Sequence, residues 1–210
     1  GLKNLSKIFL KKKIKSFLQI GSAIEYGKKK SPHIEENFIK LLKIKSLYGI
    51  SKLKSSKFLL ELSNNENFKC NIIRVYLSYG PFQKENRIIP QITRACLFNK
   101  KFNCTSGKQI RSFIYIDDLI KLIVKVIKKN KFGHIYNAGG IEKIRVKDLI
   151  KKIVSLCKGG KPIFNQLKMR NYEQNKIFPS LKKTKKEFNW LPKINIDNGL
   201  KKTVSFYKKS

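Results

Sequence analysis

The sequence predicts an α/β fold in which short buried strands alternate with amphipathic helices. Three apolar runs, at residues 16–22, 70–81 and 133–140, are short and end at small residues or at a glycine-proline break, as buried strands do. The segments after each run have the apolar spacing or the charge pattern of helices. Because helices separate the strands along the chain, the sheet is expected to be parallel, with helical crossovers.

The first half of the chain predicts a strand, a helix and a second strand. SFLQIGS, at 16–22, is an apolar run that ends at small residues. Residues 47–64 carry leucine, isoleucine and phenylalanine at roughly helical spacing until the run NNEN stops the helix. CNIIRVYLSYGP, at 70–81, is β-branched and aromatic until its glycine-proline pair breaks the strand.

The second half continues the alternation. Residues 82–111 are predicted to be rich in loops. A helix at 117–130 begins with two aspartates and ends with lysines, a charge order that suits the helix dipole. GHIYNAGG, at 133–140, is the third predicted strand, and a further amphipathic helix at 145–160 ends at glycine.

The formal charge of the 210-residue chain, +35, raises the question of a nucleic-acid partner. Arginine stands at six positions, and lysine supplies the other 42 of the 48 basic residues. Lysine, isoleucine and asparagine, all abundant here, share A/T-rich codons. A compositionally biased protein with a lysine-rich surface therefore explains the charge better than a dedicated surface for polyanions, and nucleic acid is disfavoured as a partner.

Several classes of protein are disfavoured by what the sequence contains. No apolar run approaches the roughly twenty residues of a membrane-spanning helix, and the basic cluster at 11–15 interrupts the first apolar segment, unlike an export signal. Four cysteines lack any Cys-x-x-Cys pair and only two histidines accompany them, so neither a metal site nor a disulfide framework is predicted. Scattered thiols favour the cytoplasm.

Tyr48 and Lys52 form a candidate proton-transfer pair. Residues four apart on a helix lie on one face, and a neighbouring ammonium stabilises a phenolate, which lets the phenol exchange a proton with a substrate oxygen. Ser22, at the end of a predicted strand, is a candidate to hydrogen-bond the same oxygen. The alternative is an ordinary amphipathic helix with a solvated lysine, since this spacing arises by chance in so lysine-rich a chain.

Seven motifs follow one another along nearly the whole chain: FLQIGSAIEYG (17–27), SPHIEEN (31–37), LYGISK (47–52), RVYLSYGP (74–81), GKQIRSFIYIDDLI (107–120), HIYNAGG (134–140) and KKTKKEFNWLPKINIDNGLKKTVSFYK (182–208). In pattern and order they resemble motifs of the extended short-chain dehydrogenase/reductases, specifically the NAD-dependent epimerase/dehydratase family that acts on nucleotide sugars.

The resemblance implies a partial Rossmann-type, doubly wound parallel sheet with a smaller carboxyl-terminal substrate-binding lobe. Residues 1–78 and 112–138 would belong to the NAD(P)-binding domain, and residues 79–111 and 139–210 to the substrate lobe. It also implies NAD or NADP as cofactor, a nucleotide sugar as substrate and a homodimer. The reaction would pass a hydride between the nicotinamide and a sugar carbon.

The family's catalytic roles would fall on Tyr48 as general acid/base, on Lys52, which would favour its phenolate and hold the nicotinamide ribose, and on Ser22, which would bind the reacting oxygen. Val75 would contact the cofactor.

The substrate's diphosphate would be gripped by Arg111, because guanidinium suits bidentate binding. Asn137 would contact the same ligand, with Arg170 and Arg87 as further phosphate arginines. For the arginines the alternative is a surface ion pair.

Two departures from the family pattern refine the expectation. Members that dehydrate the sugar carry an Asp-Glu pair where this chain has Ala23 and Ile24, so an epimerase or a 4-keto reductase is favoured.

The family's Gly-x-x-Gly-x-x-Gly turn, which holds the cofactor pyrophosphate, has no counterpart here, as if on the order of ninety residues and four strands were missing upstream. The chain is expected to keep its catalytic residues without a competent cofactor site, and tight NAD(H) binding by it would refute this. A non-catalytic relative that binds RNA or another polyanion is the alternative.

Overall fold

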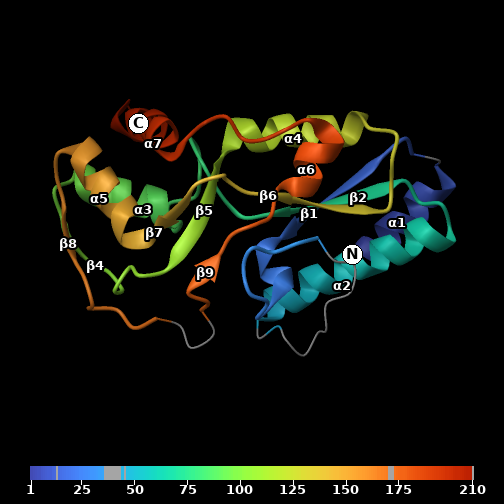
Figure 1. Ribbon diagram of the computed structural model, residues 1–210, viewed down its shortest axis with the longest axis horizontal. Helices are drawn as coiled ribbons and strands as arrows, with labels where there is room; N and C mark the ends of the chain where they lie inside the picture. The colour runs from blue at the N-terminus through green and yellow to red at the C-terminus, as the bar shows by residue number, and fades with distance from the viewer. Residues whose placement is uncertain (13, 36–43, 45, 170–172, 210) are drawn as a thin grey trace. The chain divides into compact units, whose positions relative to one another are not determined.

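The computed structural model describes residues 1–12, 14–35, 44, 46–169 and 173–209. Their elements follow in the order α1 (Leu2–Lys11), β1 (Phe17–Ser22), η1 (Ala23–Tyr26, a 3₁₀ turn), α2 (Leu47–Asn65), β2 (Cys70–Val75), β3 (Leu77–Tyr79), α3 (Ile88–Leu97), β4 (Lys101–Asn103), β5 (Ile110–Tyr115), α4 (Ile116–Lys128), β6 (His134–Ala138), β7 (Lys143–Arg145), α5 (Val146–Cys157), β8 (Lys161–Ile163), β9 (Lys176–Ile177), α6 (Lys182–Phe188) and α7 (Ile196–Lys209). The chain forms two compact units (Figure 1).

The first unit, Gly1–Tyr76 with Ile120–Ala138 and Pro179–Leu191, is built on a parallel sheet. Its strand order is β1-β2-β6, and both pairs are parallel. Figure 1 shows α2 along one face of this sheet and α6 on the other. The predicted α/β class with a parallel sheet is therefore confirmed.

The helix α2 packs on β1 and β2 through its apolar side. Leu53 and Leu59 are fully buried, and the side chain of Ser46 caps the helix by accepting a hydrogen bond from the N–H of Gly49 at 2.9 Å. Phe68 and Cys70 pack against Leu59, together with apolar residues of α1. The predicted helix at 47–64 thus forms where its apolar spacing indicated.

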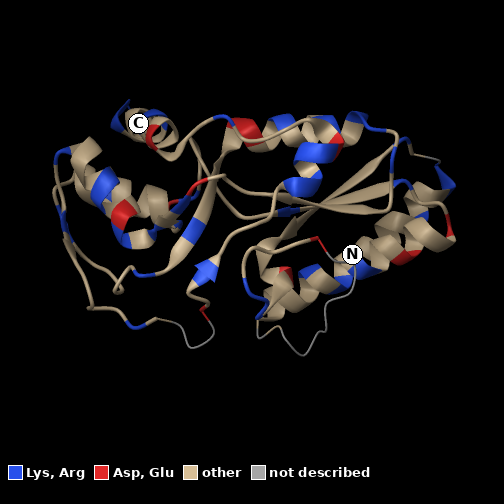
Figure 2. Cartoon of the chain, viewed as in Figure 1, with Lys and Arg blue, Asp and Glu red and all other residues tan. Residues whose placement is uncertain are grey.

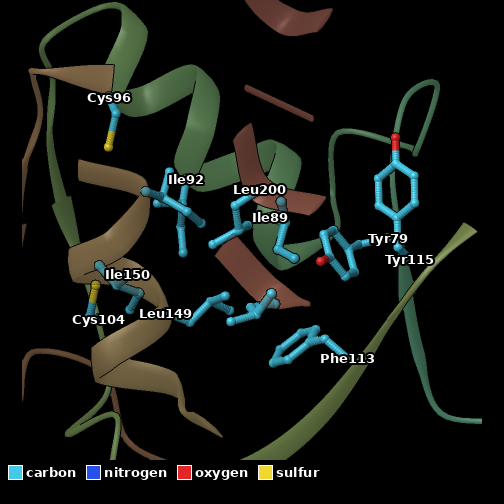
Figure 3. Packing of buried hydrophobic residues seen from close by; sticks show 12 residues of the cluster. Tyr79, Ile89, Ile92, Cys96, Cys104, Phe113, Tyr115, Leu149, Ile150 and Leu200 are labelled. Atoms are coloured by element: carbon cyan, nitrogen blue, oxygen red, sulfur yellow. The ribbon is translucent and has the colours of Figure 1, made fainter. Parts of the chain in front are cut away.

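The second unit comprises Leu77–Leu119, Gly139–Phe178 and Pro192–Ser210. Its strands β3, β5 and β7 are neighbours in one sheet, with β9 also on β5, and β4 pairs with β8. Helices α3, α5 and α7 pack on one another. Figure 3 shows the core between them, in which Ile89, Ile92, Leu149, Leu200 and Tyr79 converge.

Two expectations about this region were wrong. Residues 82–111 are not mainly loop, because α3, β4 and the start of β5 lie in them. Ile89, Ile92 and Cys96 recur at helical spacing and are buried, and Pro90 stands in the first turn, where a missing N–H is tolerated. The predicted strand at 70–81 is divided at Tyr76, whose N–H bonds Ala138 of β6 at 2.9 Å, so that β2 and β3 belong to different sheets.

The compact units differ from the expected domain ranges at residues 77–78, 112–119 and 179–191. The expected ranges divide the chain by role, into a cofactor-binding and a substrate-binding part, and this division by role stays a prediction. Among the described residues, no helix is both long enough and apolar enough to cross a membrane.

Tyr79 and Gly199 give a test of packing in the second unit. The Tyr79 hydroxyl is buried and has no hydrogen-bond partner within the described part of the chain, and a methyl group built on Gly199 of α7 would overlap it. We expect Tyr79→Phe to leave the free energy of unfolding unchanged or to raise it by up to about 1 kcal/mol.

Gly199→Ala should lower that free energy by about 1–3 kcal/mol through overpacking, and by clearly less when Tyr79→Phe is also present. Urea denaturation of the single and double variants measures the coupling. Equal costs of Gly199→Ala in the two backgrounds would contradict the packing described here.

Candidate active site

The carboxyl ends of the parallel strands in the first unit gather several predicted site residues. Ser22 of β1 pairs in register with Val75 of β2, and Val75 pairs with Ala138 of β6. Asn137 directly precedes Ala138. In open parallel sheets, ligands bind just outside the carboxyl ends of the strands, so this edge is the candidate active site.

Tyr48 and Lys52 lie together at the start of α2. The Nζ atom of Lys52 is 5.8 Å from the centroid of the Tyr48 ring and donates a hydrogen bond to the carbonyl of Ile20 at 2.8 Å. Ile20 precedes Ser22 by two residues on β1, so Lys52 ties the tyrosine's helix to the end of that strand. Tyr48 is 58% exposed, and its phenol is therefore accessible to a ligand.

Gly49 allows this helix start to approach its neighbours closely. A Cβ atom at this position would lie 2.7 Å from Cγ2 of Ile44 and 3.2 Å from Cγ1 of Ile24. The first distance is shorter than real Cβ contacts, so a side chain here would push Ile44 away from the start of the helix. The glycine after the tyrosine in the LYGISK motif thus has a packing reason.

A buried ion pair lies beneath Ser22. Nε of Arg74 is 3.0 Å from Oε2 of Glu25, and both side chains are 0% exposed. Oε1 of Glu25 accepts the backbone N–H of Ser22 at 2.7 Å, and Oε2 also accepts the hydroxyl of Ser56 at 2.8 Å. Glu25 therefore links Ser22 to β2 and to α2. This pair was not predicted from the sequence. The available signal was an arginine inside the apolar run CNIIRV, because a buried charge needs a partner.

A second buried cluster joins Tyr26, His33, Tyr76 and Asn137. The Tyr26 hydroxyl donates to Oδ1 of Asn137 at 2.7 Å, its ring stacks on His33 at 4.5 Å, and Nδ1 of His33 lies 2.9 Å from the Tyr76 hydroxyl. Burial raises the pKa of Tyr26 to about 12, although Arg74 opposes this, and burial lowers the pKa of His33. Both groups are therefore neutral near pH 7, which suits a structural role.

Asn137 is fully buried within this cluster. Its Nδ2 donates to the carbonyls of His33, at 3.0 Å, and Ser180, at 3.3 Å, while its Oδ1 accepts from Tyr26. In this arrangement the amide of Asn137 holds protein segments together. Its expected contact with a nucleotide sugar stays a prediction.

Arg111 and Arg87 belong to the second unit. Arg111 has a side chain 7% exposed and forms an ion pair with Glu173, its Nη2 lying 2.7 Å from Oε1. Its Nη1 donates to the carbonyls of Ile110, at 2.9 Å, and Asn175, at 3.4 Å. Burial lowers the pKa of Arg111 and Glu173 opposes this shift.

Arg111 does form an ion pair, but its side chain is nearly buried, unlike the surface pair considered as the alternative, and diphosphate binding stays a prediction. Arg87 is exposed at the cap of α3. Arg170 lies outside the described residues.

The fold and the site define a class of protein, a parallel-sheet α/β domain with a tyrosine-lysine pair at the carboxyl edge of its strands. The model of the NAD dependent epimerase/dehydratase family matches residues 1–139, and the chain belongs to this family. The resemblance described from the sequence motifs is thereby confirmed.

Known proteins similar to the chain include the dTDP-D-glucose 4,6-dehydratase of Homo sapiens. It is 26% identical over an alignment of 208 residues that covers 94% of this chain and 58% of the relative. The same enzyme of Mus musculus is 28% identical over 170 residues, 78% of this chain and 48% of the relative. The chain thus spans about half of each of these curated relatives.

A crystal structure similar in fold is that of UDP-glucuronic acid 4-epimerase from Bacillus cereus, in complex with UDP-glucuronic acid and NAD. Its TM-score is 0.90 at 24% identity, covering 99% of this chain and 66% of that one. This likeness confirms the Rossmann-type class of the fold.

Proposed function

We propose that the residues around Tyr48 catalyse hydride transfer between NAD or NADP and a carbon of a nucleotide sugar, in an epimerase or a 4-keto reductase. The observation that carries the proposal is the exposed Tyr48 with the Lys52 ammonium against its ring, tied to β1 beside Ser22. Membership of the family and relatives that are named for nucleotide-sugar reactions support it. The same proposal places the protein in the cytoplasm and has it act as a homodimer.

The residues present fit the ribose of a nicotinamide cofactor and a sugar hydroxyl. The ammonium of Lys52 has three donors, of which one goes to Ile20, leaving two for the hydroxyls of a ribose. The Ser22 oxygen accepts a weak bond from the N–H of Ile24 at 3.4 Å, so its own O–H is available to donate. NAD or NADP, when bound, supplies the hydride donor or acceptor.

In the proposed mechanism Tyr48 takes or gives the proton of the sugar hydroxyl. Lys52 lies one turn further along the same face of the helix, with its Nζ atom 5.8 Å from the centroid of the Tyr48 ring, and would position the phenol for this exchange. The hydroxyl of Ser22 donates to the same sugar oxygen and orients it. Tyr48 and Ser22 therefore both act on the reacting oxygen, and Lys52 acts through Tyr48 and through the ribose.

Epimerisation or ketone reduction fits this chain better than dehydration. By the family resemblance, members that dehydrate the sugar carry an Asp-Glu pair directly after the serine, and this chain has Ala23 and Ile24 there. The one carboxylate in residues 22–26 is Glu25, which is fully buried and paired with Arg74. We therefore propose this reaction class although relatives such as the human protein are named dehydratases.

Recognition of the diphosphate is proposed for Arg111, with Arg87, Arg170 and Asn137 as further contacts. Arg111 would exchange its single bond to Glu173 for bonds to phosphate oxygens, which guanidinium binds well. The carbonyls of Ile110 and Asn175 would keep the guanidinium in place during the exchange.

The proposal is tested with the full gene product that contains this chain, incubated with a panel of nucleotide sugars and NAD or NADP. Mass spectrometry and chromatography of the products separate epimers from reduced sugars. We expect conversion of at least one nucleotide sugar, and only with the nicotinamide cofactor present. No conversion, together with salt-sensitive RNA binding that survives Tyr48→Phe, would instead favour the non-catalytic alternative.

Arg111→Ala is expected to raise the Kd of the converted nucleotide sugar by at least about tenfold, because charged hydrogen bonds contribute roughly 1.5–3 kcal/mol. Isothermal titration calorimetry measures the effect. Arg145→Ala is the matched control, since Arg145 also pairs with a carboxylate, Asp148, but with its side chain 67% exposed. The same Kd for the two variants would remove Arg111 from the proposed site.

A further inference from the structure

A cavity of about 530 Å³ in the first unit is lined almost entirely by lysines. Its lining residues are Lys129, Lys131, Lys182, Lys183, Lys186 and Glu187, and Figure 2 shows the concentration of basic residues on α6. Lysine makes up 42 of the 210 residues of the chain. Five lysines among six lining residues is therefore a much higher density than the composition alone produces.

The cavity lies on the face of the sheet that carries α6, whereas Tyr48 belongs to α2 on the other face. On the side of Lys131 the cavity reaches the amino edge of the strands. Lys131 precedes the amino end of β6, and its carbonyl accepts a hydrogen bond of 2.7 Å from Nδ2 of Asn71, at the amino end of β2. Ser22 and Val75 stand at the carboxyl ends of their strands. A ligand in this cavity would therefore bind apart from the proposed active site.

Several of the lysines are held in place by contacts with the protein. Nζ of Lys129 lies 3.1 Å from Oε2 of Glu187, 2.7 Å from the Glu187 carbonyl and 4.6 Å from the centroid of the Phe188 ring. Lys131 reaches Glu187 at 3.4 Å, and Lys183 lies 4.9 Å from the centroid of the Tyr136 ring. Because these side chains are already ordered, less conformational entropy is lost when they bind an anion.

Positive charge in the cavity exceeds what its carboxylate balances. Glu187 accepts from Lys129, Lys131 and the Tyr136 hydroxyl. No carboxylate of the described residues lies within ion-pair distance of Lys182, Lys183 or Lys186.

The pKa of His134 reflects burial together with the nearby lysines, whereas the pKa of Lys183 is lowered mainly by burial. Burial lowers the pKa of Lys183 and Lys131 adds to this shift, while Glu35 and Glu187 oppose it. Burial, Lys183 and Lys131 likewise lower the pKa of His134. A bound anion would stabilise the protonated form of these crowded groups.

We propose that the lysine cavity is a binding site for a compact ligand with several phosphate groups, separate from the site at Tyr48. Ammonium groups bind phosphate oxygens as point charges, and several of them together match more than one phosphate. The volume lies in the range of small-ligand sites, roughly 300–1,000 Å³. A single-stranded RNA would be held by bases stacked on aromatic residues, and none of the six lining residues is aromatic.

Titration calorimetry with inorganic tripolyphosphate at fixed ionic strength tests the site on the 210-residue chain. We expect one saturable site, weakened roughly tenfold or more by the double variant Lys183→Gln/Lys186→Gln through loss of two charged contacts. Lys201→Gln/Lys202→Gln, on exposed positions of α7, removes the same charge elsewhere and should change the Kd less than about twofold. Tyr48→Phe should leave binding unchanged.

Lys183→Arg/Lys186→Arg keeps the charge and should retain most of the affinity, which separates loss of a contact from loss of structure. Equal weakening by the two glutamine variants would show a general charge effect and overturn the proposal. So would the absence of saturable tripolyphosphate binding. A single-stranded RNA that binds through Lys183 and Lys186 while tripolyphosphate does not would replace the compact ligand with a nucleic acid.

Discussion

Tyr48→Phe is expected to lower turnover of a nucleotide sugar by at least about 10²–10⁴-fold, the usual contribution of a positioned general acid/base. The change removes one oxygen from a side chain that is 58% exposed, so the stability of the fold and the shape of the binding site should both be unchanged. The Kd of the nucleotide sugar should change less than about threefold, because the proton moves only in the reaction. Steady-state kinetics and calorimetry on the full gene product measure the two quantities.

Tyr207→Phe is the control for this experiment. Its hydroxyl donates to the carbonyl of Gln83 at 2.9 Å, outside the residues proposed to act on the sugar, and turnover should be nearly unchanged. Lys52→Met should lower turnover and also weaken cofactor binding, since Lys52 is proposed to hold the ribose. Wild-type turnover in Tyr48→Phe would remove the tyrosine from the mechanism.

Arg74→Met should lower the free energy of unfolding by about 3–5 kcal/mol, because it leaves the carboxylate of Glu25 buried without its ionic partner. Both side chains of the pair are fully buried, and Glu25 also accepts the backbone N–H of Ser22. We therefore expect Arg74→Met to disturb the position of Ser22 at the carboxyl edge of the sheet, in addition to lowering the overall stability. Urea denaturation measures the free energy of unfolding.

The double variant Arg74→Met/Glu25→Gln should recover part of this loss, since a neutral amide replaces the uncompensated charge and can still accept from Ser22. Arg145→Met, which breaks the exposed pair with Asp148, should cost less than about 1 kcal/mol. A loss in Arg74→Met no larger than in Arg145→Met would contradict the role given to the buried pair.

The parts of the fold that the sequence predicted are those with a local signal. The strand ending at Ser22, the helix that begins at Leu47 and the strand at His134 each show apolar spacing within a few residues. The helix α3 was missed in a segment interpreted as loop, although Ile89, Ile92 and Cys96 follow helical spacing. In the sequence Pro90 looks like a helix-breaking residue, but a proline is tolerated in the first turn of a helix, where it stands.

The contacts around the site could not be predicted in the same way, because they join residues far apart in the chain. Arg74 and Glu25 are separated by 49 positions, Tyr26 and Asn137 by 111. Spacing along a helix can suggest that Tyr48 and Lys52 meet, and they do. No comparable spacing rule relates a strand residue such as Arg74 or Asn137 to a partner such as Glu25 or Tyr26, which comes from a distant turn.

Hydride transfer between a sugar carbon and a nicotinamide is the reaction proposed for the site at Tyr48. Its most direct test is to incubate the full gene product, NAD or NADP and a converted nucleotide sugar that carries deuterium on the carbon bearing the reacting hydroxyl. We expect the deuterium on the same carbon of the epimer that forms, or on the reduced nicotinamide, and at least about 10²-fold less of either labelled product in Tyr48→Phe. Release of the deuterium to water, or label transfer that is unchanged in Tyr48→Phe, would contradict it.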